Sequence, residues 1–572
     1  MENKLFRFWQ IPESENMGLR RTKMKKAFPV LAVLLPLVLV AACTKGGPAE
    51  STAGTTDPIT FTFFSSDAPP DLKWDDPIAG KITELTGVTL NIDGPVGGDT
   101  QAIPIMIASG KYPDLIFAKG DLGMLIEAGA VLPLDDLIES RGNNIRKLYG
   151  DQIVRLRNSP EDPQIYHVGT FGVNNPVWQP EGTLQIQHAV LKDLGYPTIS
   201  TLADYEKAIK DYMAKYPTIN GQKTIGISLN IGSWQWLISL GNPGGYLIGY
   251  PDDGQWIVDR DSLEAVYKFL HPDIQIWFKW LNRMYAEGIL DPESFTQTED
   301  TWKAKIAAGR VLATSFPKWG YDASRTSLVS DGMEDRTFAY LSVTADERFT
   351  DPAMKDYGWG GGWGIAITKD AKDPERAFEF LDWMAGEEAQ ILTNWGFEGK
   401  DHIIVDGIRV IPPEEQLKWN TDPDHSKKTG VGRWAHSFPE WGRGAIDSTG
   451  NFITRESPET IVQNYLPVEK ETIAAYGAEW WPDFFPPSET LGVSRHGQAW
   501  QYTLPPDLNA KLVEADNMVV KTALANMIIG SPSDFDVAWE NMVQALRRMG
   551  IEDAGKAMTQ LIRDRVQFWE KG

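Results

Sequence analysis

The chain has 572 residues and a formal net charge of −23, with 22 tryptophans, seven histidines and one cysteine. Residues 1–42 carry seven basic and three acidic side chains, so the rest of the chain is near −27. This charge argues against nucleic acid or an anionic membrane surface as the partner, because both require a basic face. The length predicts at least two domains with large apolar cores.

The first 42 residues predict a signal peptide. A basic stretch at 20–26 precedes an apolar run from Ala27 to Ala42, and small residues stand directly before Cys43. This order of basic, apolar and small residues is typical of an export signal. The run is also shorter than the roughly 20 residues that a transmembrane helix needs.

The only cysteine follows the signal directly. Val40-Ala41-Ala42-Cys43 resembles the lipobox of bacterial lipoproteins, in which the cysteine is lipidated and becomes the new N-terminus. The alternative is a buried free cysteine, but nothing near Cys43 has the pattern of a core element. Lipidation would supply two acyl chains, which suffice for stable anchoring. Residues 43–57 then form a flexible tether rich in Gly, Ser, Thr and Pro. No later cysteine is available for disulfides.

The first elements after the tether alternate between strands and helices. Residues 59–64 predict a strand, and 78–92 predict a helix, a turn and a second strand. A helix ending at Gly110 and a buried strand at 115–118 repeat the plan. This alternation predicts an α/β domain with a largely parallel sheet.

The middle of the chain gives further elements. Residues 185–217 predict two helices separated by Pro197, and 224–229 predict a strand. Asp261 has the position of a helix N-cap, with Glu264 three residues on.

Later segments continue in the same way. Residues 363–390 predict a strand, a loop and a helix with Asp373 as N-cap and Pro374 at its first position. Beyond residue 400 the chain predicts irregular structure until helices at about 507–530 and 534–569.

Five segments, in order along the chain, resemble the extracellular solute-binding lipoproteins of bacterial ABC importers. The resemblance is to the large oligosaccharide-binding group that includes alginate-binding proteins. The segments are ASGKYPDLIF (108–117), GAVLPLDDLI (129–138), LNRMYAEGILDPESFTQ (281–297), KIAAGRVLATSFPKWG (305–320) and DPERAFEFLDWMAGEEAQILTNWGFEGKDH (373–402).

The resemblance implies a class II periplasmic-binding-protein fold, with two α/β lobes, a hinge and a central ligand cleft that closes on its ligand. It also implies discontinuous lobes. We expect lobe 1 to contain 58–175 and to return, with the hinge, at 306–370. Lobe 2 would contain 176–305 and most of 371–572.

One segment departs from the family. Many relatives carry a calcium loop rich in Asp and Asn, whereas the corresponding KYPTINGQKTIG (215–226) has no Asp or Glu. A calcium site needs several oxygen ligands, usually including carboxylates. We therefore predict a plain surface turn at Asn220-Gly221, with no metal and no other cofactor.

The candidate ligand-binding residues lie in loops, mostly after predicted strands, where open α/β sheets bind ligands. Aromatic rings stack on the C–H faces of sugars, and polar side chains bond to their hydroxyls. The resemblance adds weight to three of these tryptophans, at 319, 363 and 395. By contrast, Trp277, Trp280 and Trp383 lie in helical patterns and are predicted core residues. The candidates are Asp67, Trp74, Lys119, Asp121, Trp178, Gln179, Trp234, Trp236, Trp319, Trp359, Trp363, Trp395 and Glu398.

The segment GWGGGWG (358–364) has clustered glycines without the Gly-Lys-Ser/Thr of a phosphate-binding loop. It predicts a tight hinge or a close approach to ligand, where only glycine fits.

The chain lacks the motifs of common enzymes, since it has no H-E-x-x-H pair and no G-x-S-x-G elbow. The family resemblance and the lipobox imply a monomeric, non-enzymatic receptor on the outer face of the bacterial cytoplasmic membrane. It would capture an oligosaccharide and deliver it to an ABC permease. Two alternatives stay open: a binder of peptides or other non-sugar solutes, and a lipid-anchored glycoside hydrolase, which needs only two carboxylates. Tryptophan-rich loops suit neutral sugars, whereas uronic acids would require a convergent Arg or Lys.

Overall fold

The computed structural model describes residues 56–69, 71–95, 101–180, 182–232 and 234–571. The predicted signal peptide, Cys43 and nearly all of the tether lie outside the described residues. Residues 54–572 form one compact unit. Within the described part of the chain, no helix is long and apolar enough to cross a membrane.

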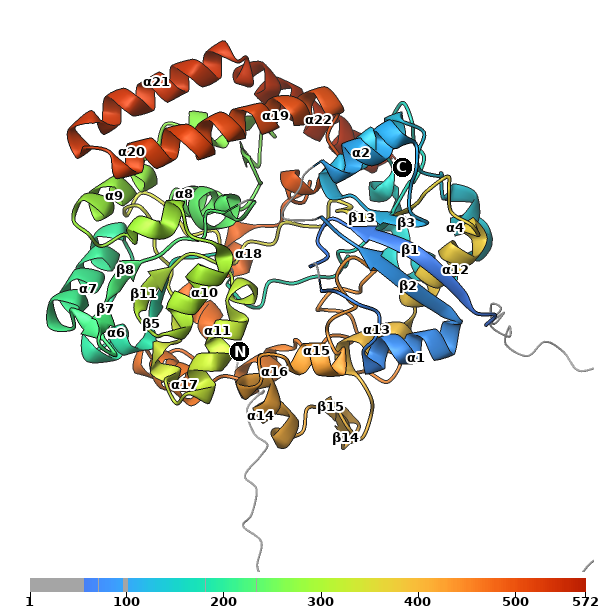
Figure 1. The fold of residues 1–572 in the computed structure, drawn as a ribbon, viewed down its shortest axis with the longest axis horizontal. Coiled ribbons are helices and arrows are strands. Elements are labelled where there is room, and N and C mark those ends of the chain that lie inside the picture. Colours follow the sequence, from blue (N-terminus) through green and yellow to red (C-terminus); the bar gives the residue numbers. More distant parts are fainter. Residues whose placement is uncertain (1–55, 70, 96–100, 181, 233, 572) are drawn as a thin grey trace, which may run out of the picture. The chain divides into compact units, whose positions relative to one another are not determined.

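The first sheet contains β1 (Ile59–Ser65), β2 (Val88–Asp93), β3 (Leu115–Phe117), β4 (Val168–Gly169) and β13 (Gly364–Ile367). Its order is β2-β1-β3-β13-β4 (Figure 1). As predicted, β1 runs parallel to β2 and β3, whereas β13 is antiparallel to β3 and β4. All residues of β3 and β13 are buried, as in strands covered on both faces.

Aspartate side chains cap two helices of this lobe, and the cap at Asp373 was predicted. α1 (Pro77–Thr86) begins where the Asp76 carboxylate accepts a hydrogen bond from the Ala79 amide. α12 (Pro374–Met384) begins at Asp373, with Pro374 in its first turn, and α13 (Glu387–Trp395) follows. These three helices share one hydrophobic core with β1, β3 and β13. The others are α2 (Ala102–Ser109), α3 (Leu122–Glu127), α4 (Asp135–Arg141) and α5 (Asn143–Tyr149).

The second sheet contains β5 (Gln185–Gln187), β8 (Ile225–Ile227), β11 (Val311–Thr314) and β12 (Phe338–Tyr340), in the order β12-β5-β11-β8. As predicted, α6 (His188–Asp193) and α7 (Leu202–Lys215) flank Pro197. α9 (Gln275–Ala286) buries Trp277 and Trp280, again as predicted. The other helices here are α8 (Asn242–Tyr246), α10 (Glu299–Ala307) and α11 (Asp322–Ser330).

Two expected lobe boundaries need correction. Residues 306–370 do not return to the first sheet as a block, because β11 pairs with β5 and β8, and β12 pairs with β5. Only β13 returns. Likewise, the segment after 371 is not mostly in the second lobe: α12, α13 and residues up to Phe438 pack in the core of the first sheet. Buried residues from Ile461 to Trp569 join the core of the second sheet.

The helix expected to start at Asp261 is absent. The Asp259 carboxylate instead accepts hydrogen bonds from the amides of Asp261 and Ser262, which closes a turn. The chain then forms β10 (Ala265–Tyr267), antiparallel to β9 (Trp256–Val258). Local Asp–backbone bonding competes with a helix start, and the β-prone residues that follow favour a strand.

The predicted turn at Asn220-Gly221 is confirmed. It joins β6 (Thr218–Ile219) to β7 (Gln222–Lys223) as a two-residue hairpin, and both turn residues have positive φ. This is the conformation that an Asn-Gly pair favours between antiparallel strands.

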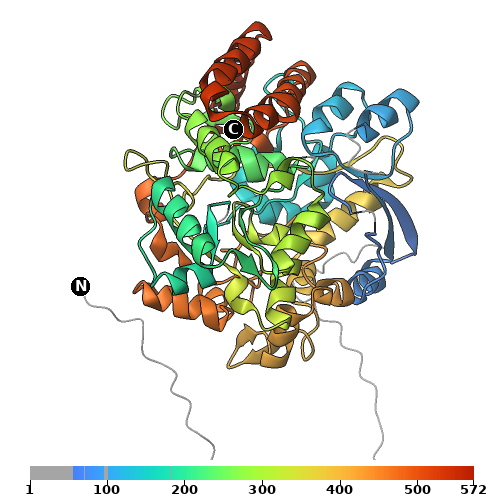
Figure 2. The same cartoon turned by 60° about the vertical axis from the view of Figure 1, so that its left-hand side comes forward.

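The C-terminal region is helical, with α19 (Pro506–Met518), a π-helical segment (Val519–Leu524), α20 (Ala525–Ile529), α21 (Phe535–Arg548) and α22 (Ile551–Lys571). The predicted helix at 534–569 is thus two helices, because Gly550 takes a φ of 73° between them. α21 and α22, in red, pack side by side (Figures 1 and 2). Between residues 400 and 500 the elements are short: β14 (Ile403–Val405), β15 (Ile408–Val410), α14 (Pro413–Thr421), α15 (His425–Thr429), α16 (Pro458–Gln463), α17 (Pro467–Ala475) and α18 (Ser488–Leu491).

Candidate ligand-binding site

The best-formed candidate site lies where strands of the two sheets end. Asp67 follows β1 and Lys119 follows β3, while Trp363 directly precedes the antiparallel β13. In the second sheet, Trp234 follows β8 and Trp319 follows β11. The carboxyl ends of parallel strands meet at one edge, which explains why residues distant in sequence converge here.

A polar group forms the side of the site on the first lobe. The Lys119 ammonium donates to Asp67 at 2.9 Å, and a ring nitrogen of His436 lies 3.0 Å from the second oxygen of that carboxylate. Burial by itself would raise the pKa of Asp67, but the hydrogen bond from His436 and the charge of Lys119 lower it to about 2. Asp67 is therefore a carboxylate at any physiological pH.

Aromatic rings surround this polar group. The Lys119 ammonium lies 4.3 Å from the ring centre of Trp363 and 5.9 Å from that of Trp234, so one cation touches indoles of both lobes. Trp363 packs edge-on against Trp500, with ring centres 4.7 Å apart. Phe171 contacts both of these rings.

Trp234 and Trp319 form an exposed pair on the second lobe. Their ring centres are 6.1 Å apart and their planes differ by 22°. Trp234 is 50% exposed and Trp319 is 56% exposed. Two exposed indoles in contact form a small apolar patch, and such patches mark sites of binding.

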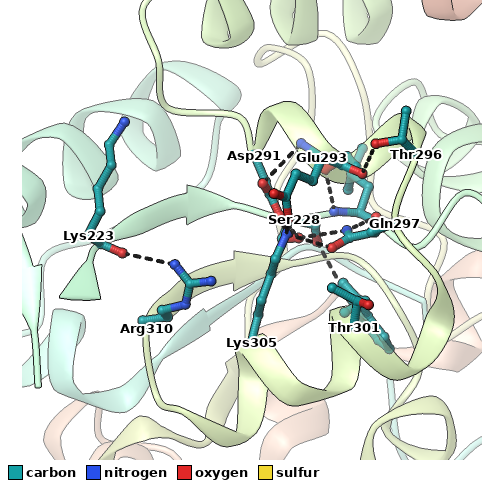
Figure 3. Close-up of polar contacts among 12 residues, drawn as sticks. Lys223, Ser228, Asp291, Glu293, Thr296, Gln297, Thr301, Lys305 and Arg310 are labelled. Carbon is teal, nitrogen blue, oxygen red and sulfur yellow. Dashed lines mark hydrogen bonds and ion pairs between the residues drawn. The ribbon is translucent and has the colours of Figure 1, made fainter.

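A buried polar network fixes the loop that carries Trp234 (Figure 3). The Lys305 ammonium bonds to Asp291 at 2.7 Å and to Gln297 at 2.8 Å. Asp291 accepts in turn from the hydroxyl of Ser228, the first residue after β8. Gln297 donates to the carbonyl of Leu229. The first two residues of the loop are therefore tied to α10 and to the segment before it.

A second buried cluster holds Trp500. A Cβ on Gly254 would lie 2.4 Å from the Cβ of Trp500, so only glycine fits against this side chain. The neighbouring Asp253 is fully buried and pairs with Arg260 at 2.8 Å. Burial raises the pKa of Asp253, which Arg260 opposes. Arg260 also contacts His496, which precedes Trp500 in the same loop.

Several predicted site residues lie elsewhere. Trp359 is 7% exposed and donates to the Phe171 carbonyl, while Trp395 is buried and donates to the Ile453 carbonyl. Both indoles are core residues in this structure. Trp74 packs on Trp434, Trp178 on Phe452 and Trp236 on Phe269. We therefore leave these five rings out of the proposed surface.

The remaining polar candidates lie outside the group formed by Asp67, Lys119 and His436. Asp121 accepts a hydrogen bond from Asn509, and burial raises its pKa. Glu398 is exposed in the turn after α13, and Gln179 is half-buried in the segment that leads to the second lobe. Of the thirteen predicted residues, the structure gathers Asp67, Lys119, Trp234, Trp319 and Trp363.

Three residues of the site were missed: Phe171, His436 and Trp500. Phe171 lies two residues after the short strand β4, His436 lies in an irregular segment, and Trp500 lies in a short 3-10 turn, Ala499–Gln501. No strand precedes any of them in the sequence pattern. The one available signal for Trp500 was its loop context in a tryptophan-rich chain.

The glycine segment, residues 358–364, is crossed closely by other segments of the same chain. Gly358 abuts the Ser494 carbonyl, Gly361 abuts the Arg155 carbonyl, and a Cβ on Gly360 would lie 2.9 Å from the His496 carbonyl oxygen. Gly358 and Gly361 also have positive φ. Close approach of other backbone segments to the stretch that leads from β12 of the second sheet to β13 of the first therefore explains the predicted need for glycine.

A separate groove of about 560 Å³ lies near the C-terminus of α22. It contains none of the exposed indoles and neither Lys119 nor Asp67, and of the thirteen predicted residues only Trp359 lines it. Among the described residues, no group of three or more His, Cys, Asp or Glu side chains is placed to hold a metal ion. The groove is lined in part by Gln152, Arg155, Trp359, Arg495, Val566 and Trp569.

Comparison with known proteins agrees with this architecture. The chain is 24% identical over 413 residues to lipoprotein LipO of Bacillus subtilis, covering 68% of this chain and 76% of that protein. It is also 24% identical over 413 residues to the fructooligosaccharide ABC transporter substrate-binding protein FusA of Streptococcus pneumoniae, covering 66% and 72%.

Among solved structures, the alginate-binding protein AlgQ2 without calcium ion aligns with a TM-score of 0.64 at 16% identity, over 89% of this chain and 99% of that one. FusA in complex with kestose aligns with a TM-score of 0.62 at 16% identity, over 90% and 99%. These structures establish the two-lobed solute-binding-protein fold. The family model for bacterial extracellular solute-binding proteins matches residues 78–395, and the chain belongs to this family.

Proposed function

We propose that this protein is a lipid-anchored receptor that captures an oligosaccharide outside the cell and delivers it to an ABC transporter permease. The observation that carries the proposal is the exposed Trp234–Trp319 pair, placed across from Lys119, Asp67 and Trp363. Indoles supply stacking surfaces for sugar rings, and the polar group supplies donors and acceptors for hydroxyls. The relatives named as fructooligosaccharide-binding and alginate-binding support a sugar ligand.

The mechanism follows from contacts that span the lobes. Lys119 belongs to the first lobe and touches Trp234 of the second. A sugar held between the indoles contacts both lobes at once only when they are close together. It therefore favours the closed arrangement through its differential affinity for that state. The closed receptor is the form that the permease would recognise.

The lipid anchor is supported by the sequence around Cys43. Cys43 stands in the lipobox-like segment, and the relative LipO is itself named a lipoprotein. A tethered monomer on the outer face of the cytoplasmic membrane keeps the captured sugar near the transporter and raises its effective concentration there. Replacing Cys43 with Ser should abolish incorporation of labelled palmitate and release the chain into the medium. Retention of label by Cys43→Ser would disprove anchoring at this residue.

The ligand class is tested on the compact unit from Gly54 onward. We expect an oligosaccharide to raise the midpoint of thermal unfolding, since native-state binding stabilises by about 2.7 kcal/mol at one hundred times Kd. A shift produced only by a peptide pool would favour the alternative of a peptide receptor. Mass spectrometry of the bound sugar separates a receptor from a glycoside hydrolase, because a receptor returns the sugar uncut.

A further inference from the structure

We infer that the site accepts a neutral oligosaccharide rather than a uronate-containing one, with two consecutive sugar rings on the Trp234–Trp319 pair. The inference rests on the proposed function and names the substrate class of that site. It follows from the charges that face the indoles and from the geometry of the rings.

The cation at the centre of the site already has a counter-ion. The Lys119 ammonium is 2.9 Å from the Asp67 carboxylate, and its side chain is 27% exposed. Within the described residues, Lys119 is the one cation that lies over Trp234 or Trp363. A ligand carboxylate approaching Lys119 would meet the negative charge of Asp67 at nearly the same distance, so it would gain little.

The neighbouring charged side chains that the structure describes do not add a free positive charge that would attract a ligand carboxylate. Lys318 precedes Trp319, but it lies 4.0 Å from Asp322. Burial alone would raise the pKa of Glu469, and the charges of Arg325 and then Lys318 lower it. Glu299, bonded to Gln235 at 2.6 Å beside Trp234, is paired with Lys303. Recognition of a uronate calls for an arginine fork aimed at the ligand. Among the described residues, the arginine–ring contacts lie on aromatic rings other than Trp234, Trp319, Trp363 and Trp500.

The aromatic geometry suits an extended, uncharged ligand. The two indoles are stacked, with planes 22° apart and centres 6.1 Å apart, and about half of each side chain remains exposed for a ligand. Stacking uses the C–H faces of successive sugars and needs no charge. The ligand hydroxyls can then bond to Asp67, Lys119 and His436, which offer both donors and acceptors.

The test is capture from a defined mixture. A partial hydrolysate of plant polysaccharides is separated by anion exchange into neutral and uronate-containing fractions, and each is passed over the immobilised Gly54–Gly572 unit. We expect retention from the neutral fraction and at least tenfold less from the acidic one, with retention that changes less than about twofold between 0.05 and 0.5 M salt. Preferential retention of uronates would overturn the inference and leave the proposed function intact. If neither sugar fraction is retained but a peptide pool is, both the inference of a neutral ligand and the proposed function of an oligosaccharide receptor are wrong.

Two variants test the charge and the stacking separately. Asp67→Asn frees Lys119 and should raise the ratio of uronate to neutral affinity by about tenfold, since an adjacent charge changes such equilibria by a factor of ten or more. An unchanged ratio would contradict the charge argument. Trp319→Ala should weaken a tetrasaccharide about tenfold and a monosaccharide much less. The control is Trp480→Ala, since Trp480 bonds to Asp483 in another segment and should leave binding unchanged. Equal losses for both sugar lengths would contradict the two-ring arrangement.

Discussion

Replacing Lys305 with Met gives the sharpest test of how the ligand-binding loop is held. Lys305 is only 6% exposed, and its ammonium bonds to the Asp291 carboxylate, which is 4% exposed. It also bonds to Glu293 and Gln297. Met has nearly the same length and volume, so the change removes the charge with little loss of packing.

The expected cost follows from what the substitution leaves behind. Asp291 would keep its hydrogen bond from Ser228 but would lose its only ion pair among the described residues. Removing one partner of a buried ion pair costs about 3–5 kcal/mol, because the other charge remains buried without compensation. Glu293 adds little, since its side chain is 60% exposed.

Urea unfolding followed by tryptophan fluorescence measures this cost as a change in the free energy of unfolding. Lys207→Met is the control, because Lys207 on α7 pairs with the exposed Asp211 and lies outside the loop that carries Trp234. It should lose at most about 1 kcal/mol. Ligand affinity should fall in Lys305→Met but not in the control, because Ser228 starts the loop that carries Trp234. Equal losses of stability in the two variants would refute the reasoning.

Three further predictions concern the site, the crossing segment and pH. Trp319→Ala should weaken the ligand yet lower the free energy of unfolding by less than about 1 kcal/mol, because the ring is already 56% exposed; a large loss in a urea titration would show that the ring is structural. Gly361→Ala should cost about 2–4 kcal/mol, since φ is 90° and the methyl group would overlap the Arg155 carbonyl. Gly110→Ala, with positive φ but open space, should cost only about 1 kcal/mol by the same titration, and similar losses would contradict the clash. Burial lowers the pKa of His188 to about 4, so below about pH 6.5 the unfolded chain takes up a proton that the native state does not. Unfolding free energy should therefore fall between pH 6.5 and 4, by up to about 3 kcal/mol for this residue, and a His188→Gln variant should show a correspondingly smaller fall across that range.

Local signals predicted the first lobe well. The alternating β1 segment, the Gly110 helix end and the Asp373-Pro374 start of α12 all depend on interactions within a few residues, and each is confirmed. The Asn220-Gly221 hairpin belongs to the same class. The Asp261 prediction failed because two local patterns competed, and the turn closed by Asp259 prevailed.

Lobe membership was harder to predict, because it depends on pairing between distant strands. β11 and β12 contain short apolar stretches that would fit either sheet, and their partner β5 was hidden at the start of a helical pattern. The same limit applies to the tryptophans. Trp359 stands in the same glycine-rich segment as Trp363, and Trp395 ends α13 directly before Gly396. Carbonyls 188 and 58 residues away accept their indole N–H groups. Burial of a loop ring is decided by such partners, which no local pattern reveals.

The five site residues that the sequence did anticipate lie in loops next to strands whose positions are fixed by the sheets. Phe171 also follows a strand, but β4 has only two residues and leaves no pattern in the sequence. His436 and Trp500 lie in irregular segments, so all three were missed. The crossing segment joins the two groups. Gly358 and Gly360 of this segment lie against the backbone carbonyls of Ser494 and His496. The segment 358–363 ends in Trp363 and the segment 494–500 ends in Trp500, and the two rings are in contact. A relative movement of the lobes that shifts this crossing must also shift the aromatic pair. The glycines at the crossing and the indoles proposed to bind sugar are therefore coupled through the same two short segments. A substitution that displaces these segments should lower the affinity for the sugar even where no contact with the ligand is lost.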